Sequence, residues 1–516
     1  MTTVRSTTLR LPSRTVNPEA LGPFRWGKVG DNIVLTNDAG EWSILPTTDF
    51  ATFLKGEVTQ AHPRFDELRM RGFLRSDLDL EELASKIRRK RHYLGSGPHL
   101  AVVITTLRCN QSCIYCHASR TDMHRTDTDM SLTTARMAVD HAMKTPSPYL
   151  CFEYQGGEPT VNWDVLKFCV QYARESNKQV GKILDHSVVT NMTYMNEERA
   201  NWLVDHNVLV CTSLDGPEQV HNSNRPWTGK NAAAYESVVK WMEYFNQRYI
   251  DRGLDPELWH VDALMTTTRR SMENWKEIVD LYVGMGIRNI HLRPLNPFGF
   301  ATRTWRAVGY TMDEWLDFYA RTLDYILDLN RQGVQIMEGT AATFLKKMLT
   351  PDDPNFVDIR TPVGSGTGQI CYGFDGSIFP SDEGRMVHGM GDPIFKIGHL
   401  RDTSFEDAMT HPTVRAIATA SYLDTLPQCD TCWNAPYCGV RPLHNYMQSG
   451  DLFGQRPNTP KCQQHMGIVG MLFDRLANDP DGTVASIFRR WTVDRPRLLD
   501  EPGDSEGAGR HHGPER

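Results

Sequence analysis

Three cysteines within eight residues form the group in this chain best suited to do chemistry. Cys109, Cys113 and Cys116 stand in the run Cys-Asn-Gln-Ser-Cys-Ile-Tyr-Cys. Their spacing lets three thiolates hold three irons of a [4Fe–4S] cube, while the fourth iron stays open for a ligand. A structural zinc site would need a fourth protein ligand, which His117 could supply. The spacing therefore indicates a catalytic iron–sulfur centre, with structural zinc as the alternative.

A second group of cysteines lies in the last third of the chain. Cys429, Cys432 and Cys438 follow one another closely, and Cys462 comes further along. Four thiolates complete the coordination of either a zinc ion or a [4Fe–4S] cluster. The spacing alone predicts a closed metal centre and leaves both metals open.

The segments that must position the first cysteines alternate between strands and helices. Residues 100–105 are an apolar, β-branched run typical of a buried parallel strand, and they lead directly into the cysteine run. Further strands are predicted at 149–154, 185–190, 208–213, 260–265 and 289–293, and helices at 133–144, 163–175, 197–206, 233–248 and 272–285. These six βα units predict an α/β fold with a partial (β/α)6 TIM-like barrel, whose active site lies at the C-terminal ends of the strands.

A Gly-Gly-Glu motif, Gly156–Glu158, ends the second predicted strand. Paired glycines allow a ligand to approach the backbone closely, and Glu158 can pair with an ammonium group. The same residues also suit an ordinary turn at a strand end. Their position one strand after the cysteine run favours ligand binding.

The cysteine spacing, with Tyr115 before the last cysteine, and the Gly-Gly-Glu motif resemble the radical S-adenosylmethionine (SAM) superfamily. In that family SAM binds the open iron, and its reductive cleavage gives a 5′-deoxyadenosyl radical that abstracts a hydrogen atom from the substrate. The resemblance implies that Tyr115 lies against the adenine and that Gly156, Gly157 and Glu158 hold the methionyl amine.

Further polar residues at strand ends match contacts of the same family. The resemblance implies that Asn191 contacts the ribose, and that Ser213 and Arg225 contact the SAM carboxylate. Gln155 is implied to touch the substrate backbone. Capping of strand ends is the alternative role for each of these side chains.

The second cysteine group resembles the SPASM auxiliary-cluster domain of peptide-modifying enzymes. The resemblance implies a second [4Fe–4S] cluster on Cys429, Cys432, Cys438 and Cys462, with structural zinc as the alternative. Fuller members of that class carry a cysteine where this chain has Ser381, so two clusters are expected in place of three. Asp382 follows, and the resemblance implies a role as a base on the substrate, whereas its plain role is turn formation.

Composition argues against several classes of partner. The net charge of −7 is not that of a nucleic-acid-binding surface, which is basic and clustered. The chain shows no apolar segment long enough for a signal peptide or a membrane span, and its many thiols need no disulfide framework, so a cytoplasmic enzyme is expected. The remaining cysteines are expected to be small buried side chains: Cys151, Cys169, Cys211 and Cys371.

Flanking segments predict a further module. Residues 32–45 alternate like a hairpin with a turn at 37–40, and helices are predicted at 48–55 and 64–71. This pattern resembles the small winged-helix-like modules that capture peptides, although a hairpin packed on the barrel fits it equally.

The basic run 86–91 is expected on a solvated helix that joins two domains. The predicted organisation is a disordered tail (1–20), this module and its linker (21–92), the barrel (97–335), the SPASM-like domain (336–475) and a largely disordered extension (476–516).

Taken over most of its length, the chain resembles the His-Xaa-Ser system (HxsB-type) radical SAM maturases. That resemblance implies a ribosomally made precursor peptide as substrate and a flavodoxin- or ferredoxin-like electron donor. It implies a carbon–carbon or carbon–heteroatom crosslink between side chains. The alternatives are formylglycine formation of the sulfatase type, thioether formation, and a non-enzymatic zinc-binding adaptor.

Overall fold

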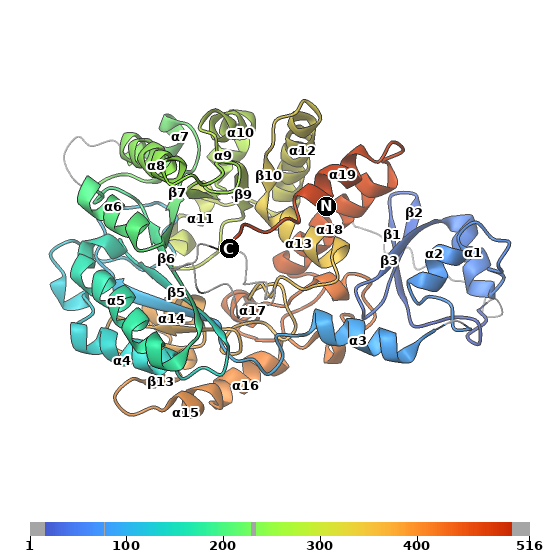
Figure 1. Cartoon of the computed structure of the whole chain (residues 1–516), viewed down its shortest axis with the longest axis horizontal. Coiled ribbons are helices and arrows are strands. Elements are labelled where there is room, and N and C mark those ends of the chain that lie inside the picture. Colours follow the sequence, from blue (N-terminus) through green and yellow to red (C-terminus); the bar gives the residue numbers. More distant parts are fainter. Residues whose placement is uncertain (1–15, 77, 229–233, 498–516) are drawn as a thin grey trace.

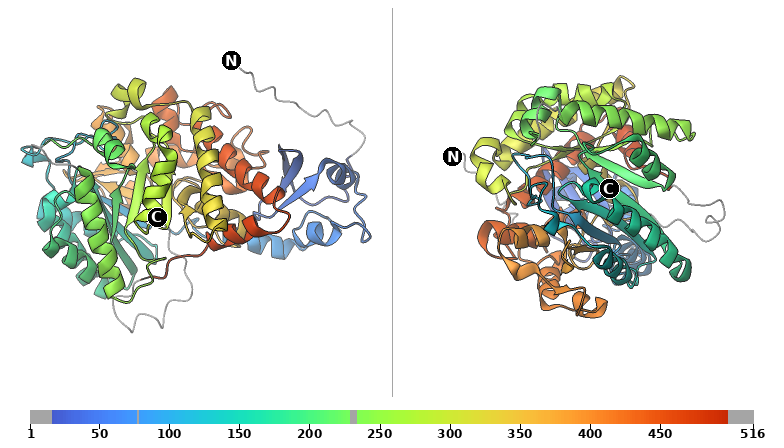
Figure 2. Two further views of the ribbon diagram at one scale, coloured as in Figure 1. Left: turned by 90° about the horizontal axis from the view of Figure 1, so that it is seen from above. Right: turned by 90° about the vertical axis from the view of Figure 1, so that its left-hand side faces the viewer.

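A computed structural model describes residues 16–76, 78–228 and 234–497, and within them it contains two separate sheets. One is a three-stranded sheet near the N-terminus, and the other is a ten-stranded sheet that holds the rest of the strands. Figures 1 and 2 show the small sheet and its helices at one end of the molecule and the large sheet at the other.

The N-terminal module has three antiparallel strands followed by three helices. The strands are β1 (Arg25–Val29), β2 (Asn32–Thr36) and β3 (Trp42–Pro46), and the helices are α1 (Thr47–Lys55), α2 (Phe65–Met70) and α3 (Leu80–Lys90). The predicted hairpin is confirmed as β2 and β3, and β1 adds a third strand that the sequence did not indicate. The module has its own apolar core, centred on Leu35, Leu45, Phe53 and Phe73.

Six parallel strands of the large sheet stand side by side in chain order. They are β4 (Leu100–Thr106), β5 (Tyr149–Gly156), β6 (Ile183–Thr190), β7 (Val208–Ser213), β8 (Asp262–Thr266) and β9 (Asn289–Arg293). The helices between them are α4 (Leu132–Ala142), α5 (Trp163–Val180), α6 (Glu197–Asp205), α7 (Glu218–Asn224), α8 (Ala234–Asp251), α9 (Arg269–Glu273) and α10 (Trp275–Gly284). The predicted six βα units are confirmed, except that the helix expected at 272–285 is two helices separated at Asn274.

Alternate residues of the barrel strands face a hollow interior. Phe152 and Tyr154 of β5 are buried in the apolar core, whereas Glu153 and Gln155 line a cavity. The residues that line the cavity from β6 to β9 are mostly small or polar: Ser187, Val189, Thr190, Cys211, Ser213, Asp262, Ala263, Leu264, Thr266, Asn289, His291 and Arg293. Because large apolar side chains normally fill such interiors in layers, this polar row leaves space for a ligand.

Further strands extend the sheet beyond the barrel on both sides. β10 (Met337–Glu338) pairs with β9, while β11 (Gln369–Tyr372) pairs with β4 and continues into β12 (Ser377–Phe379) and β13 (Gly398–His399). The remaining helices are α11 (Ala301–Val308), α12 (Met312–Arg331), α13 (Gly339–Leu349), α14 (Asp382–Gly389), α15 (Phe405–Met409), α16 (Pro412–Thr419), α17 (Pro442–Ser449), α18 (Pro460–Ala477) and α19 (Thr483–Arg490). None of the helices in the described ranges is long and apolar enough to cross a membrane.

Two expectations about the flanking segments need correction. The basic helix α3 is not solvated throughout, because Lys90 is buried and its Nζ donates hydrogen bonds to the carbonyls of Lys347 and Thr350, both at 2.7 Å. The extension after 475 is ordered as far as Arg497, since α19 buries Val484, Ile487 and Phe488 against α12, α13 and α18. The expected disorder of 1–15 and 498–516 concerns residues outside the described ranges.

Candidate active site

The first three cysteines lie in the loop after β4, at the C-terminal edge of the sheet. Cys109 is buried, Cys113 and Cys116 are half-buried, and all three are free thiols. They line a cavity of about 370 Å³ that continues down the barrel to Asp262, at the start of β8. The strand and the cysteine run therefore place three thiols at the mouth of the hollow interior.

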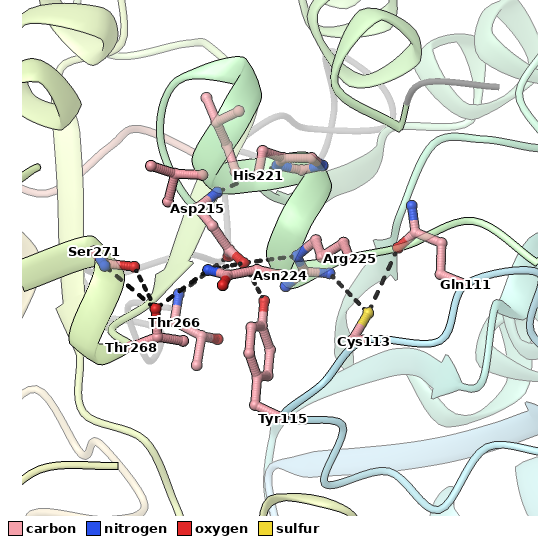
Figure 3. Close-up of polar contacts among 12 residues, drawn as sticks. Gln111, Cys113, Tyr115, Asp215, His221, Asn224, Arg225, Thr266, Thr268 and Ser271 are labelled. Atoms are coloured by element: carbon pink, nitrogen blue, oxygen red, sulfur yellow. Dashed lines mark hydrogen bonds and ion pairs between the residues drawn. The ribbon is translucent and has the colours of Figure 1, made fainter. Parts of the chain in front are cut away.

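Polar hydrogens are directed at the sulfur atoms of this triad. The Gln111 backbone amide lies 3.4 Å from Cys109 Sγ, and the Asn191 side-chain amide lies 3.7 Å from the same atom. Arg225 Nη1 lies 3.9 Å from Cys113 Sγ (Figure 3). Burial raises the pKa of Cys113 to about 12 although Arg225 opposes it, so binding of a metal at this thiol would release its proton. Three thiols with N–H donors around them fit a [4Fe–4S] cluster.

Gly156 and Gly157 let β5 approach the cysteine loop. A Cβ on Gly156 would lie 2.0 Å from the Thr106 carbonyl oxygen, and a Cβ on Gly157 would lie 2.4 Å from the Arg108 carbonyl oxygen. The Gly157 amide donates a hydrogen bond of 2.8 Å to the Thr106 carbonyl. Both glycines also line the cavity, so the backbone is open to a ligand on its other side.

Glu158 has a different position from the one its neighbours suggest. Its side chain is fully buried, and its carboxylate accepts hydrogen bonds from the Thr190 hydroxyl at 2.7 Å and from the Asn191 amide at 2.7 Å. It also accepts the amide and hydroxyl hydrogen bonds of Thr160. This corrects the expected contact between the Glu158 side chain and an ammonium group, because the carboxylate instead ties the ends of β5 and β6 together.

Tyr115 belongs to a buried network of charged and polar groups, shown in Figure 3. Its hydroxyl donates a hydrogen bond of 2.5 Å to Asp215, which also accepts from Arg225 Nε at 3.2 Å and from Asn224 at 3.3 Å. Arg225 lies 5.3 Å from the centre of the Tyr115 ring. The loop after β7 and the end of α7 thereby fix the tyrosine and the arginine at the cavity wall.

The other polar residues implied for SAM line the same cavity from neighbouring strands. Asn191 follows β6, Ser213 ends β7 and Gln155 precedes the end of β5. The Gln155 amide donates a hydrogen bond to the Glu153 carboxylate. The structure thus brings together, around one space, every implied SAM contact except the Glu158 side chain.

Asp382 also faces the cavity, next to a second carboxyl. Asp382 and Glu383 begin α14, whose N-terminus is capped by Ser381, and both line the cavity. Burial and the adjoining Asp382 carboxyl raise the pKa of Glu383 to about 7, and burial raises the pKa of Asp382. Two carboxyls that share a hydrogen bond in one enclosed space hold one proton between them below about pH 7, and the pair then keeps one negative charge.

The second cysteine group is formed by one loop and the start of α18. Cys429, Cys432 and Cys438 lie in a loop of tight turns, and Cys462 lies in the first turn of α18. Each of the other three is close enough to Cys438 to raise the pKa of its thiol, and burial raises that of Cys462 to about 11. In the described ranges, no three His, Cys, Asp or Glu side chains are arranged around a single metal ion.

Comparison with known proteins identifies the family. The model of the radical SAM superfamily matches residues 103–282, which hold the triad and most of the barrel. The cysteine-type anaerobic sulfatase-maturating enzyme of Clostridium novyi is 30% identical over 362 residues, which are 68% of this chain and 87% of that enzyme. This chain belongs to the radical SAM superfamily. As a radical SAM protein related to maturating enzymes it is an enzyme, which corrects the alternative of a non-enzymatic adaptor.

Two solved structures share the fold of this radical SAM enzyme. The enzyme anSMEcpe, solved with bound AdoMet and a peptide named Cp18Cys, has a TM-score of 0.60 at 18% identity, and it covers 76% of this chain and 100% of its own. SuiB of Streptococcus suis, solved with its precursor peptide SuiA, has a TM-score of 0.50 at 13% identity and covers 85% of this chain and 99% of its own.

Several residues of the radical SAM site were not predicted from the sequence. Asp215 lies two residues after the end of β7, and this position near a strand end was the one available sign of its role. Glu383 was not predicted, because the family resemblance pointed to its neighbour Asp382 alone. The cavity residues Arg293, Arg441 and Lys461 lie far apart in the sequence and meet only in the fold.

Proposed function

We propose that this radical SAM enzyme oxidises a side chain of a ribosomally made precursor peptide and installs a carbon–carbon or carbon–heteroatom crosslink. When bound on Cys109, Cys113 and Cys116, the [4Fe–4S] cluster and SAM supply a 5′-deoxyadenosyl radical that takes a hydrogen atom from the substrate. The electron for SAM cleavage would come from a flavodoxin- or ferredoxin-like donor. The chain itself would position SAM, hold the peptide and exclude water from the reaction.

The observation that carries this proposal is the docking of the N-terminal module onto the second cysteine loop. Gly27 of β1 lies against Trp433, and the Thr36 hydroxyl donates a hydrogen bond of 2.7 Å to the Trp433 carbonyl. The Tyr437 hydroxyl donates to the Gly40 carbonyl at 3.0 Å. A winged-helix-like module in this place could capture the leader of a peptide by adding it as a strand to its sheet.

The shares of the chain covered by the comparisons support the same proposal. The sulfatase-maturating structure is covered completely by 76% of this chain, so about a quarter of the chain has no counterpart there. The structure of the peptide-binding protein SuiB covers 85%.

Named residues of the chain have the following roles in this proposal. Asn191 would hold the ribose, Ser213 and Arg225 the carboxylate of SAM, and the backbone of Gly156 and Gly157 its amine. Tyr115, fixed by Asp215, would stand at the adenine. Each of these contacts requires only groups that already line the cavity.

The second cysteine group would hold an auxiliary cluster. Cys429, Cys432, Cys438 and Cys462 supply the four thiolates of a closed [4Fe–4S] site, and a cluster there would serve as an electron acceptor. Asp382 would take a proton from the substrate, which fits its exposure to the cavity and its partner Glu383. Hydrogen-atom loss, proton loss and electron acceptance together account for a two-electron oxidation.

Formylglycine formation of the sulfatase type is the second candidate function. The identity of 30% to the Clostridium novyi enzyme over 68% of this chain favours it. It uses the same triad and the same cavity, and it differs in the peptide and in the fate of the oxidised side chain.

Co-production with candidate peptides would test the proposal. The enzyme is expressed anaerobically with each short reading frame that flanks its gene, and the peptides are examined by mass spectrometry. A crosslink removes two hydrogens, links two residues and produces no aldehyde. A product that reacts with an aldehyde reagent at a single former cysteine or serine would establish the sulfatase-type activity instead.

A further inference from the structure

One wall of the cavity carries basic side chains from three elements. Arg293 ends β9, Arg441 directly precedes α17, and Lys461 lies in the first turn of α18. All three line the cavity that contains the cysteine triad. They lie close enough together that each acts to lower the pKa of one carboxyl, Asp358.

Within the described ranges, the two guanidinium groups are only partly paired with carboxylates. Arg441 Nη2 lies 2.8 Å from the Asp358 carboxylate, and its Nε is buried without a hydrogen-bond partner. Over the described ranges, no carboxylate lies within ion-pair distance of Arg293. Lys461 donates a hydrogen bond of 3.2 Å to the Gln464 side-chain oxygen, and burial lowers the pKa of this lysine well below its usual range. Arg293 is an exposed residue that lines the cavity, and Arg441 keeps a free Nε–H, so both guanidinium groups can bind an anion that enters the cavity.

The other titratable groups around the wall leave Arg293 without an ion-pair partner in the described ranges. Asp382 and Glu383 hydrogen-bond to each other, and the pKa of Glu383 is raised to about 7, so below that pH the two share one proton and keep one negative charge. His291 lies beneath Arg293, and burial lowers its pKa to about 3, so it stays neutral. Two guanidinium groups therefore face Asp358 and a carboxyl pair that keeps one negative charge, and Asp358 pairs with Arg441.

The wall is separate from the groups expected to hold SAM. Arg293 stands on β9, at the far side of the barrel from β4 and its cysteine loop, whereas Ser213 ends β7 and Arg225 follows α7. Arg293 is still close enough to act on the pKa of His117, next to the triad. An anion on this wall would thus lie beside the reaction centre and face it.

We propose that Arg293 and Arg441, with Lys461 beside them, form a subsite for a carboxylate of the peptide substrate. This inference rests on the proposed function, since it names the chemistry of the substrate that the same cavity receives. The planar guanidinium groups suit two-point binding of a carboxylate. The carboxylate is either an acidic side chain near the modified residue or the C-terminus of the peptide.

Small carboxylate probes test the subsite in the anaerobic holoenzyme with SAM bound. The probes are N-acetyl-aspartic acid α-amide for a side chain and N-acetylglycine for a C-terminus, with N-acetyl-asparagine α-amide as the neutral match. Saturation-transfer difference NMR measures their binding. Carboxylate binding should weaken about tenfold in Arg293→Gln. It should weaken less in Arg293→Lys, because a lysine keeps the positive charge but cannot make the two-point contact of a guanidinium group.

Two further variants complete the test. Asp358→Asn removes the one paired carboxylate, so carboxylate binding should tighten roughly threefold. Arg303→Gln, on the exposed face of α11, should leave all three probes unchanged. The probe whose binding is lost in Arg293→Gln identifies the source of the carboxylate.

The subsite is overturned if the neutral probe binds as well as the carboxylates or if carboxylate binding survives in Arg293→Gln with no gain in Asp358→Asn. The proposed function is tested separately, by mass spectrometry of the peptides that are co-produced with the unmodified enzyme. Modified peptide without carboxylate binding rejects the subsite alone. Carboxylate binding without any modified peptide rejects the maturase function and the peptide as the source of the carboxylate.

Discussion

Gly156 and Thr106 are in such close contact that no side chain fits between β5 and the cysteine loop. A Cβ at position 156 would lie 2.0 Å from the Thr106 carbonyl oxygen, and the φ of Gly156 is +143°, a value that other residues rarely adopt. The neighbouring Gly157 amide donates its hydrogen bond to the same carbonyl. The glycines of the Gly-Gly-Glu motif therefore set the position of the loop that carries the triad.

The first prediction concerns the contact between Gly156 and Thr106. Gly156→Ala should push the loop away and strain the backbone, at a cost of about 1–3 kcal/mol for each effect. Iron per chain should fall by about four after anaerobic reconstitution, and SAM cleavage should be lost. Gly284→Ala is the matched control, because its Cβ would meet nothing within 4 Å. Full iron content and normal SAM cleavage in Gly156→Ala would contradict the packing role.

The barrel could be predicted from the sequence because its strands are short apolar runs separated by amphipathic helices. The predicted segments 208–213 and 289–293 match β7 and β9, and the triad lies at the end of β4 as expected. Local patterns of this kind depend on residues that are neighbours in the chain, and this is the information a sequence offers directly.

The parts that were missed depend on contacts between distant residues. β1 could not be separated from a loop, since its five residues alternate weakly and its Gly27 is explained only by Trp433. Glu158 was assigned to a ligand because nothing local shows that Thr190 and Asn191 surround it. The cavity wall that carries Arg293, Arg441 and Lys461 is assembled from three separate segments.

The second prediction concerns the buried ion pair between Asp215 and Arg225. Asp215→Asn keeps the shape but leaves the guanidinium without its charged partner, which should lower the free energy of unfolding by about 3–5 kcal/mol. SAM binding, measured by equilibrium dialysis, should weaken because Tyr115 and Arg225 both lose their anchor.

Asp127→Asn provides the control for this pair. Its partner Arg125 and Asp127 itself are both exposed, so no measurable change in stability is expected. Equal effects of the two substitutions on stability and on SAM binding would show that the buried network does not position the site.

The third prediction concerns the contact between the N-terminal module and the second cysteine loop. A Cβ on Gly27 would lie 2.0 Å from Trp433 Cδ1, so Gly27→Ala should loosen the module at a cost of about 1–3 kcal/mol. Hydrogen–deuterium exchange should increase in β1–β3 and in the loop around Trp433. Lys28→Ala, on the exposed side of β1, should leave exchange unchanged. Identical exchange in both variants would place the module apart from the loop.

The fourth prediction concerns the second cysteine group. The unmodified enzyme should hold about eight irons per chain, and Cys462→Ser should hold about four. Peptide modification should be lost in this variant, because the electron acceptor is missing. About four irons and one zinc in the unmodified enzyme would instead establish a structural zinc site and contradict the auxiliary cluster.

The fifth prediction concerns pH and Glu383. The pKa of this carboxyl is raised from 4.5 to about 7 in the folded enzyme, so between these values the folded state binds the proton and the unfolded state does not. Stability that comes from this group is present at low pH and is lost as the pH rises toward 7. Glu383→Gln should therefore raise Tm at pH 8 and change it little at pH 5. A larger gain in Tm at pH 5 than at pH 8 would contradict the predicted direction of the pH dependence.

The most direct test of the central claim follows the hydrogen atom. A precursor peptide produced in deuterated medium is incubated anaerobically with the holoenzyme, SAM and reductant, and the 5′-deoxyadenosine is analysed by mass spectrometry. The account predicts that deuterium appears in the 5′-deoxyadenosine in proportion to the modified peptide. Cleavage of SAM without transfer of deuterium, with the peptide unchanged, would contradict it.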